Sequence, residues 1–379
     1  MEKQESEVIF ILYGIMSLPV NSSMQRATWR RLVKNKGAVL GMFIILAAFV
    51  IATLAFFIAP DSSPNANRMI VEIGAQKPGT RQMFLKEDKA RQVPNVSLLK
   101  RLLYGQDDSF RLIPVNRYQV IKDTVIVEKY IDEGLYENVR LPLTNFPGNI
   151  KNRFITTTAW LGTDKYGRDI LSRLIVGIRV SLSVGLIAII ISLTIGVLLG
   201  ATAGYFRGWI DDIITWLINI IWSIPTLLLV FAITLLLGKG FWQVFIAVGL
   251  TMWVSVARLV RGQVLAVREL EYVEAARALG FSHNRIIWRH ILPNILGPVL
   301  VVAASNFASA IVIEAGLSFL GVGVQPPQPS WGLMIKENYN FIITHNPMLA
   351  LAPGFAIMLL VLAFNLLGNG LRDALDVKQ

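Results

Sequence analysis

One polar stretch of the sequence, from Arg261 to Asn294, concentrates residues whose types and spacing suit contact with another protein. The residues that carry this interpretation are Glu274, Ala275, Ala276, Arg277, Gly280, Ile291, Leu292 and Pro293. The alanines keep a helix surface thin enough for close approach, whereas Glu274 and Arg277 carry charges that can fix an orientation. The chemistry expected here is docking rather than catalysis.

The same stretch predicts two short helices joined by a tight turn. Strong helix formers fill positions 269–279, and Gly280 ends that helix because glycine readily adopts φ > 0. Ser282 is placed to cap a second short helix, which Pro293 closes before the next apolar run. Such an elbow could seat in a groove of a partner protein; the alternative is an ordinary amphipathic surface loop.

A second cluster of glycines, arginines and acidic residues lies between positions 161 and 173. Its members are Gly162, Thr163, Asp164, Gly167, Arg168, Asp169, Ser172 and Arg173. The glycines predict a turn, and the residues that follow predict an interfacial helix. The arginines are expected either to contact lipid phosphates or to pair with Asp164 and Asp169, in preference to binding a substrate.

Two further residues interrupt long apolar stretches. Pro225 removes a backbone hydrogen bond and must bend its helix, either to line a path or simply to pack against neighbours. Glu314 is an ionisable residue within such a stretch, and such residues are rare at membrane depth, so we predict a functional role for it, such as lining a translocation path. The alternative for Glu314 is a structural brace, with Asn306, Ser309 and Ser318 close enough along the chain to satisfy its carboxylate.

The residue inventory excludes several classes of chemistry. The chain has no cysteine, so it contains neither disulfides nor thiolate metal ligands. The three histidines form no H-E-x-x-H pattern, and no G-x-x-x-x-G-K-S/T motif occurs, so neither a zinc protease nor an ATP-hydrolysing site is predicted. We predict no catalytic residue, no metal site and no cofactor bound by this chain.

The elements that position these residues follow from composition. Of the 379 residues 54% are hydrophobic and only 16% are charged, too few charges to cover a water-facing surface. Apolar residues gather in continuous runs of roughly 17–25 residues, which is the length a helix needs to cross a bilayer. We therefore predict an all-α polytopic membrane protein with six transmembrane helices. The predicted spans are Gly37–Ala59, Ser181–Phe206, Ile213–Leu237, Val244–Val260, Leu296–Leu320 and Leu349–Leu367.

The distribution of Lys and Arg predicts the orientation. A basic cluster between Arg26 and Lys36 precedes the first span, and five arginines lie in the polar stretch between the fourth and fifth spans. Both segments are cytoplasmic by the positive-inside rule, and an even number of spans returns the C-terminus to the same side. These loops explain much of the net charge of +11, so nucleic-acid binding is not predicted.

The chain divides into a cytoplasmic N-terminal segment (1–36), the first transmembrane helix (37–59), an extracytoplasmic insert (60–160) and a transmembrane domain (161–379) with the cytoplasmic loop 261–294. Within the insert, Tyr118 to Tyr130 is rich in β-branched and aromatic residues and predicts one or two strands, so we expect a mixed α/β insert. For the residues up to Val20 we expect an interfacial stretch, or an over-long start with Met24 as the first native residue. Gly196, Gly200 and Gly204 have the spacing that permits close helix packing.

At these positions the chain resembles the permease subunits of ABC importers. Glu274-Ala-Ala, Gly280 and the ending Ile291-Leu-Pro match the EAA loop of that family. A second set of motifs is similar to the oligopeptide/dipeptide permeases: Leu161–Asp169, Gly208–Asp211, Ser223–Pro225, Glu314–Gly321, Gln325–Pro327, Ser330–Gly332 and Leu371–Asp373. Asn219 and Asn369 stand where that group often has an acidic residue, and the insert is longer than in typical members.

The resemblance implies a type I ABC importer permease-like fold in a bacterial inner membrane, with both termini cytoplasmic. It implies that the loop 261–294 is a coupling helix seated on an ATP-binding subunit. The implied partners are a homologous second permease subunit, two ATP-binding subunits that hold ATP and Mg, an extracytoplasmic solute-binding protein and membrane lipid.

The implied cargo is a peptide, with nickel complexes or other small solutes as the alternative. The rival from another class is a secondary transporter driven by an ion gradient. Such transporters usually show internal repeats and ionisable residues near the bilayer midplane. The chain shows no convincing repeat and few charges within its apolar runs.

Overall fold

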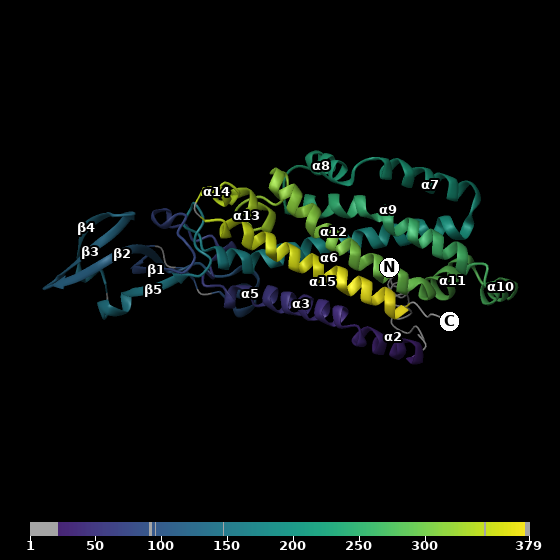
Figure 1. Ribbon diagram of the computed structural model, residues 1–379, viewed down its shortest axis with the longest axis horizontal. Coiled ribbons are helices and arrows are strands. Elements are labelled where there is room, and N and C mark those ends of the chain that lie inside the picture. Colours follow the sequence, from purple (N-terminus) through teal and green to yellow (C-terminus); the bar gives the residue numbers. More distant parts are fainter. Residues whose placement is uncertain (1–21, 91–92, 95, 147, 345, 376–379) are drawn as a thin grey trace, which may run out of the picture.

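The computed structural model describes residues 22–90, 93–94, 96–146, 148–344 and 346–375. The N-terminal stretch up to Val20, for which an interfacial segment or an over-long start is expected, lies outside the described residues. The molecule is elongated, with a five-stranded sheet at one end, the helices α10 and α11 at the other, and long helices running between them (Figure 1).

The long helices make up most of the chain. They and the shorter helices between them are α2 (Ser22–Lys34), α3 (Lys36–Thr53), α4 (Ala55–Ile58), α6 (Ile170–Phe206), α7 (Gly208–Ser223), α8 (Thr226–Leu237), α9 (Phe241–Val267), α10 (Glu271–Ala278), α11 (His283–Ile286), α12 (Leu292–Leu320), α13 (Trp331–Asn338), α14 (Phe341–Thr344) and α15 (Met348–Leu375). By length and composition, five helices in the described residues could cross a membrane, or six if the bent pair α7–α8 counts as one crossing. A helical membrane protein is therefore confirmed.

The second apolar helix begins earlier than the predicted Ser181. It starts at Ile170, because Asp169 caps it: the Oδ2 atom of Asp169 accepts a hydrogen bond from the backbone N–H of Ser172 at 2.8 Å. The residues that were expected to form a separate interfacial helix are therefore the first turns of α6, and that expectation is wrong.

Helices α6 and α9 pack closely because of glycines on α6. A Cβ atom added at Gly196 would lie 2.5 Å from Cβ of Val256, and one added at Gly200 would lie 2.9 Å from Cβ of Val260. The close packing predicted from the glycine spacing is confirmed. Because the contacts advance along both helices together, α6 and α9 run parallel. The intervening pair α7–α8 therefore carries the chain back from one end of the bundle to the other.

The pair α7–α8 is bent by 94° at Pro225. Ile224, which precedes the proline, is extended with ψ of 129°, as steric contact with a following proline ring favours. Pro225 then stands at the N-cap of α8. The proline therefore divides the predicted third span into two helices instead of kinking one.

Pro293 does not end a helix, contrary to the prediction. Residues 283–320 run as one helical segment, in which a π-helical turn from Ile287 to Ile291 joins α11 to α12. Pro293 falls in the first turn of α12. The π-helical turn that directly precedes Pro293 widens the backbone, and this accommodates the proline within the continuous segment.

The region between α4 and α6 contains an antiparallel sheet. Its strands are β1 (Thr80–Asp88), β2 (Phe110–Ile121), β3 (Thr124–Asp132), β4 (Leu135–Pro142) and β5 (Phe154–Ala159), in the order β4-β3-β2-β1-β5. The stretch predicted as strands forms the β2–β3 hairpin, in which Ile121 pairs with Thr124. Helix α5 (Leu98–Tyr104) lies between β1 and β2 in the sequence and packs near α4.

Candidate functional site

The elbow formed by α10, the following turn and α11 is anchored to the ends of the long helices. Val273 and Ala276, three residues apart on α10, are 0% and 4% exposed. They pack in one apolar cluster with Val264 of α9 and with Ile286 and Ile287 of the α11 segment. The elbow is therefore held firmly between α9 and α12.

A Schellman turn shapes the elbow at Gly280. Gly280 adopts φ of +75°, and its backbone N–H donates to the carbonyl of Arg277 at 2.9 Å. The backbone N–H of Phe281 donates to the carbonyl of Ala276 at 3.2 Å, which completes the motif. The helix termination predicted at Gly280 is confirmed.

The outer face of the elbow is thin and exposed. The exposed residues of α10 and the turn are Glu271, Tyr272, Glu274, Ala275, Arg277, Ala278, Leu279 and Gly280. Leu279 is 73% exposed, so this face also offers an apolar side chain to a partner surface. Ile291 and Leu292 instead lie buried in the anchoring cluster, and Pro293 is half-buried beside them.

Tyr205, near the end of α6, braces the elbow and was not singled out from the sequence. Its hydroxyl lies 2.9 Å from Nδ1 of His283. The guanidinium carbon of Arg277 lies 5.5 Å from the centre of its ring. Arg268 donates a hydrogen bond to its backbone carbonyl. A tyrosine at the end of an apolar run carries no sequence signal for such a role, because its partners lie far along the chain.

A second brace joins α10 to the start of α12. The side-chain N–H of Asn294 donates to the hydroxyl of Tyr272 at 2.9 Å. Burial raises the pKa of Tyr272 above its usual value, while the hydrogen bond with Asn294 opposes that rise. Tyr272 is therefore neutral across the physiological pH range and serves as a hydrogen-bonding group.

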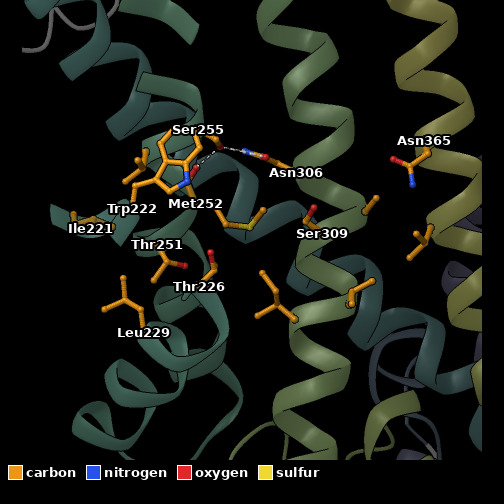
Figure 2. Close-up of a pocket in the computed structure, with 15 residues that line it drawn as sticks. Ile221, Trp222, Thr226, Leu229, Thr251, Met252, Ser255, Asn306, Ser309 and Asn365 are labelled. Carbon is orange, nitrogen blue, oxygen red and sulfur yellow. Dashed lines mark hydrogen bonds between the residues drawn. The ribbon is translucent and has the colours of Figure 1, made fainter. Parts of the chain in front are cut away.

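An open cleft of about 510 Å³ lies between the long helices, at the bend of α7–α8. It is lined by Ile221, Trp222, Thr226, Leu229, Thr251, Met252, Val254, Ser255, Asn306, Ala308, Ser309, Val312, Ile313, Val361 and Asn365. Figure 2 shows Ser255 and Asn306 pointing toward each other across it, and the Nδ2 atom of Asn306 donates to Oγ of Ser255 at 3.1 Å. The lining is apolar with a few uncharged polar groups.

The two residues predicted for a translocation path take different positions. Pro225 lies at the bend, next to Thr226 in the cleft wall. Glu314 is not among the lining residues; it is 0% exposed and accepts a hydrogen bond from Oγ of Ser318 at 2.7 Å. Of the residues expected to satisfy this carboxylate, Ser318 does so, whereas Asn306 donates to Ser255 instead. Ser330 also hydrogen-bonds Glu314 and was not foreseen.

The cluster between positions 161 and 173 forms a buried ion network at the sheet end of the bundle. Nε of Arg168 lies 2.6 Å from a carboxylate oxygen of Asp164, and its Nη2 lies 2.8 Å from Glu337 of α13. Arg173 contacts the same two carboxylates, each at 3.2 Å. Of the two expected alternatives, pairing with Asp164 is therefore confirmed; contact with lipid phosphates is wrong, because both arginine side chains are only 2% exposed.

The remaining members of that cluster fasten the loop to the preceding segment. Oγ1 of Thr163 accepts from the backbone N–H of Gln76 at 2.9 Å. Gly162 and Gly167 both have positive φ, and a side chain at Gly167 would collide with the carbonyl of Ile70. Their role is therefore to allow close approach of two backbone segments.

The buried carboxylates of this region have shifted pKa values. Burial raises the pKa of Glu337, and the neighbouring Arg168 opposes that rise. Burial also raises the pKa of Asp169, which hydrogen-bonds Ser172 rather than pairing with an arginine of its own cluster. Within the described residues, no three His, Cys, Asp or Glu side chains come together as a metal site.

Two family models match the chain. Residues 196–379 match the binding-protein-dependent transport system inner membrane component, and residues 22–78 match the N-terminal TM domain of oligopeptide transport permease C.

Curated proteins with similar sequences are transport permeases. The chain is 39% identical over 274 residues to a dipeptide transport system permease protein of Alkalihalophilus pseudofirmus. The aligned region covers 72% of this chain and 90% of the relative. It is 43% identical over 219 residues to a glutathione transport system permease protein of Pectobacterium atrosepticum, covering 58% of this chain and 72% of the relative. Among solved structures, an inward-facing MetNI methionine ABC transporter matches with a TM-score of 0.45 and 19% identity, covering 54% of this chain and 97% of the other.

Proposed function

The chain belongs to the family of binding-protein-dependent transport system inner membrane components and is a permease subunit of an ABC importer; on this premise we propose that it imports peptides and supplies half of their translocation path. The relatives named for dipeptide and glutathione transport support a peptide cargo. Nickel complexes or other small solutes are the alternative within the family.

The observation that carries the proposal is the elbow. It presents a thin exposed face of α10, yet Val273 and Ala276 fix it to the ends of the long helices. Because no flexible loop separates that face from α9 and α12, a force applied to it moves both helices. Such a rigid projection suits a coupling helix, on which closure of an ATP-binding subunit acts to switch access between the two sides.

A cytoplasmic elbow sets the orientation of the whole chain. The return of α7–α8 between the parallel helices α6 and α9 supports six crossings rather than five. The basic residues near the elbow and before α3 support a cytoplasmic location for that end and for both termini. The sheet, at the opposite end of the bundle, is then the extracytoplasmic insert, where a solute-binding protein would dock.

The cleft supports a path completed by a second subunit. It is open along one side and lined by uncharged side chains from α7, α8, α9, α12 and α15. A homologous permease subunit facing this side would close the path. The cleft lining contains no Asp, Glu or His, which argues against a proton-driven secondary transporter, because such transporters relay protons through chains of these residues.

In this proposal the permease supplies the path, and ATP with Mg is held by two separate ATP-binding subunits. The test is uptake by the reconstituted complex of both permeases, both ATP-binding subunits and the binding protein in proteoliposomes. We expect uptake of a radiolabelled dipeptide that requires ATP and is blocked by vanadate. Uptake that persists without the ATP-binding subunits and follows an imposed ion gradient would contradict the proposal.

A further inference from the structure

Arg258 on α9 is a positive charge held only by neutral groups. Its guanidinium carbon lies 3.1 Å from the centre of the Trp222 ring, and its Nη2 donates to Oδ1 of Asn219 at 3.4 Å. One turn further along α9, Arg261 differs: its Nη2 lies 2.7 Å from a carboxylate oxygen of Asp211. In the described part of the chain, Arg261 has a carboxylate partner and no ion pair is formed by Arg258.

The position of Arg258 ties this charge to the cleft. Ser255, which lines the cleft, lies three residues earlier and therefore on the same face of α9. Trp222, which holds the guanidinium, is itself part of the cleft wall and lies beside Ser255 in Figure 2. The fifteen residues that line the cleft carry no charge, so Arg258 supplies a cation at the edge of an otherwise neutral path.

An arginine within a membrane helix is costly unless it has a partner or a function. The Trp222 ring and the Asn219 amide orient the guanidinium without neutralising it, because neither carries a negative charge. The planar guanidinium has five N–H donors in a fork that matches a carboxylate. The single hydrogen bond to Asn219 uses one of these donors, so most of the fork is available to a ligand.

We propose that Arg258 is the binding site for a carboxylate of the solute as it passes through the cleft. This role rests on the peptide cargo proposed above, since a peptide carries a carboxylate at its C-terminus. Trp222 and Asn219 hold the side chain at the cleft edge between transport events. The contact is transient, since a path must bind its solute weakly enough to release it.

The test compares two probes that differ only in this carboxylate. The complete transporter with its binding protein is reconstituted in proteoliposomes, and ATP-driven uptake of alanyl-alanine and of alanyl-alanine amide is measured. Because the binding protein has its own preference, the quantity compared is the ratio of the two uptake rates in each variant relative to the wild type. We expect Arg258→Gln to lower the ratio of free peptide to amide roughly tenfold, the size expected for losing a charge-assisted hydrogen bond, and Arg258→Lys to restore part of it.

A second pair of variants tests the charge without removing the arginine. Asn219→Asp places a fixed carboxylate against Arg258, where it competes with the solute, so we expect the same ratio to fall several-fold. Asn219→Leu removes the hydrogen bond and adds no charge, and we expect its ratio to stay near that of the wild type.

Three outcomes would overturn the inference. An equal loss of uptake for both probes in Arg258→Gln would mean that the arginine does not bind the carboxylate. Failure of this variant to assemble with the second permease subunit would assign Arg258 to an ion pair between subunits. Uptake of neither probe by the wild-type complex would contradict the peptide cargo itself, and the carboxylate role of Arg258 with it.

Discussion

The hydroxyl of Tyr205 lies 2.9 Å from Nδ1 of His283, so the end of α6 is joined directly to the elbow that projects between α9 and α12. The two residues are 78 positions apart in the sequence. Through this contact the helix that packs along α9 shares any movement of the elbow. We therefore expect coupling to depend on a residue outside the loop that is proposed to contact the ATP-binding subunit.

Tyr205→Phe should weaken coupling while leaving assembly intact. The substitution removes the hydrogen bond to His283, worth about 0.5–1.5 kcal/mol, but keeps the ring on which Arg277 stacks. We expect the ATP-binding subunits to co-purify normally and peptide uptake per ATP hydrolysed to fall. Tyr205→Ala, which also removes the ring, should reduce it further. An unchanged ratio of uptake to hydrolysis in both variants would count against the brace.

The turn at Gly280 can be tested with a matched glycine elsewhere. Gly280 and Gly134 have φ of +75° and +79°, and neither would place a Cβ within 4 Å of another atom. Alanine at either position costs roughly 1–2 kcal/mol of backbone strain. We expect Gly280→Ala to reduce co-purification of the ATP-binding subunits and Gly134→Ala to leave it unchanged.

Stronger changes in the elbow should uncouple the protein without preventing its insertion. Gly280→Pro removes the N–H that caps α10, and Glu274→Lys reverses a charge on its exposed face. Both variants should reach the membrane, bind the ATP-binding subunits weakly and fail to transport. The measurements are co-purification and the ATPase activity of the assembled complex; normal coupled transport in both would refute the docking role.

The apolar helices could be predicted from sequence because a bilayer demands a minimum length of apolar chain, whatever the tertiary contacts. The elbow could be predicted because Gly280 acts locally, through its own φ. The ends of the elements were less predictable. Pro293 was expected to end a helix, yet a π-helical turn carries the chain past it, because packing of the anchoring cluster outweighs a local preference.

The partners of the charged residues could be predicted only where they lie close in the sequence. Pairing of Arg168 with Asp164 was one of the two expected alternatives and is confirmed, whereas its second partner, Glu337, lies 169 positions away and was not foreseen. Glu314 was considered for the path, but the bundle buries it away from the cleft. Both outcomes depend on how the helices pack, which no short motif encodes.

The orientation of the chain is testable because it contains no cysteine. Ser97 at the start of α5 and Ser282 in the elbow are both exposed and lie toward opposite ends of the bundle. A membrane-impermeant thiol reagent applied to intact cells should label Ser97→Cys and spare Ser282→Cys. In inverted vesicles the pattern should reverse. Labelling of Ser282→Cys from outside would invert the proposed topology.

The contact between α6 and α9 should tolerate no added volume. A Cβ at Gly200 would lie 2.5 Å from the carbonyl oxygen of Ala257, whereas one at Gly262 would meet nothing within 4 Å. We expect Gly200→Val to destabilise the bundle by about 1–3 kcal/mol, as overpacking does, and Gly262→Val to cost much less. The measurement is the midpoint of thermal unfolding in detergent; equal midpoints would mean that the helices separate without penalty.

The sheet can be removed at a point where its ends meet. Thr80 at the start of β1 pairs with Ala159 at the end of β5, so a short Gly/Ser linker can replace residues 81–158 without stretching the chain. The replacement leaves Thr163, Asp164 and the ion network in place.

Because the sheet stands at the end of the bundle opposite the elbow, we expect the permease without it to assemble with its ATP-binding subunits as before. We expect it to bind the solute-binding protein at least several-fold more weakly. Surface plasmon resonance on nanodisc complexes measures that affinity, and co-purification of the ATP-binding subunits provides the control. Unchanged affinity together with unchanged uptake would leave the sheet without a role in docking.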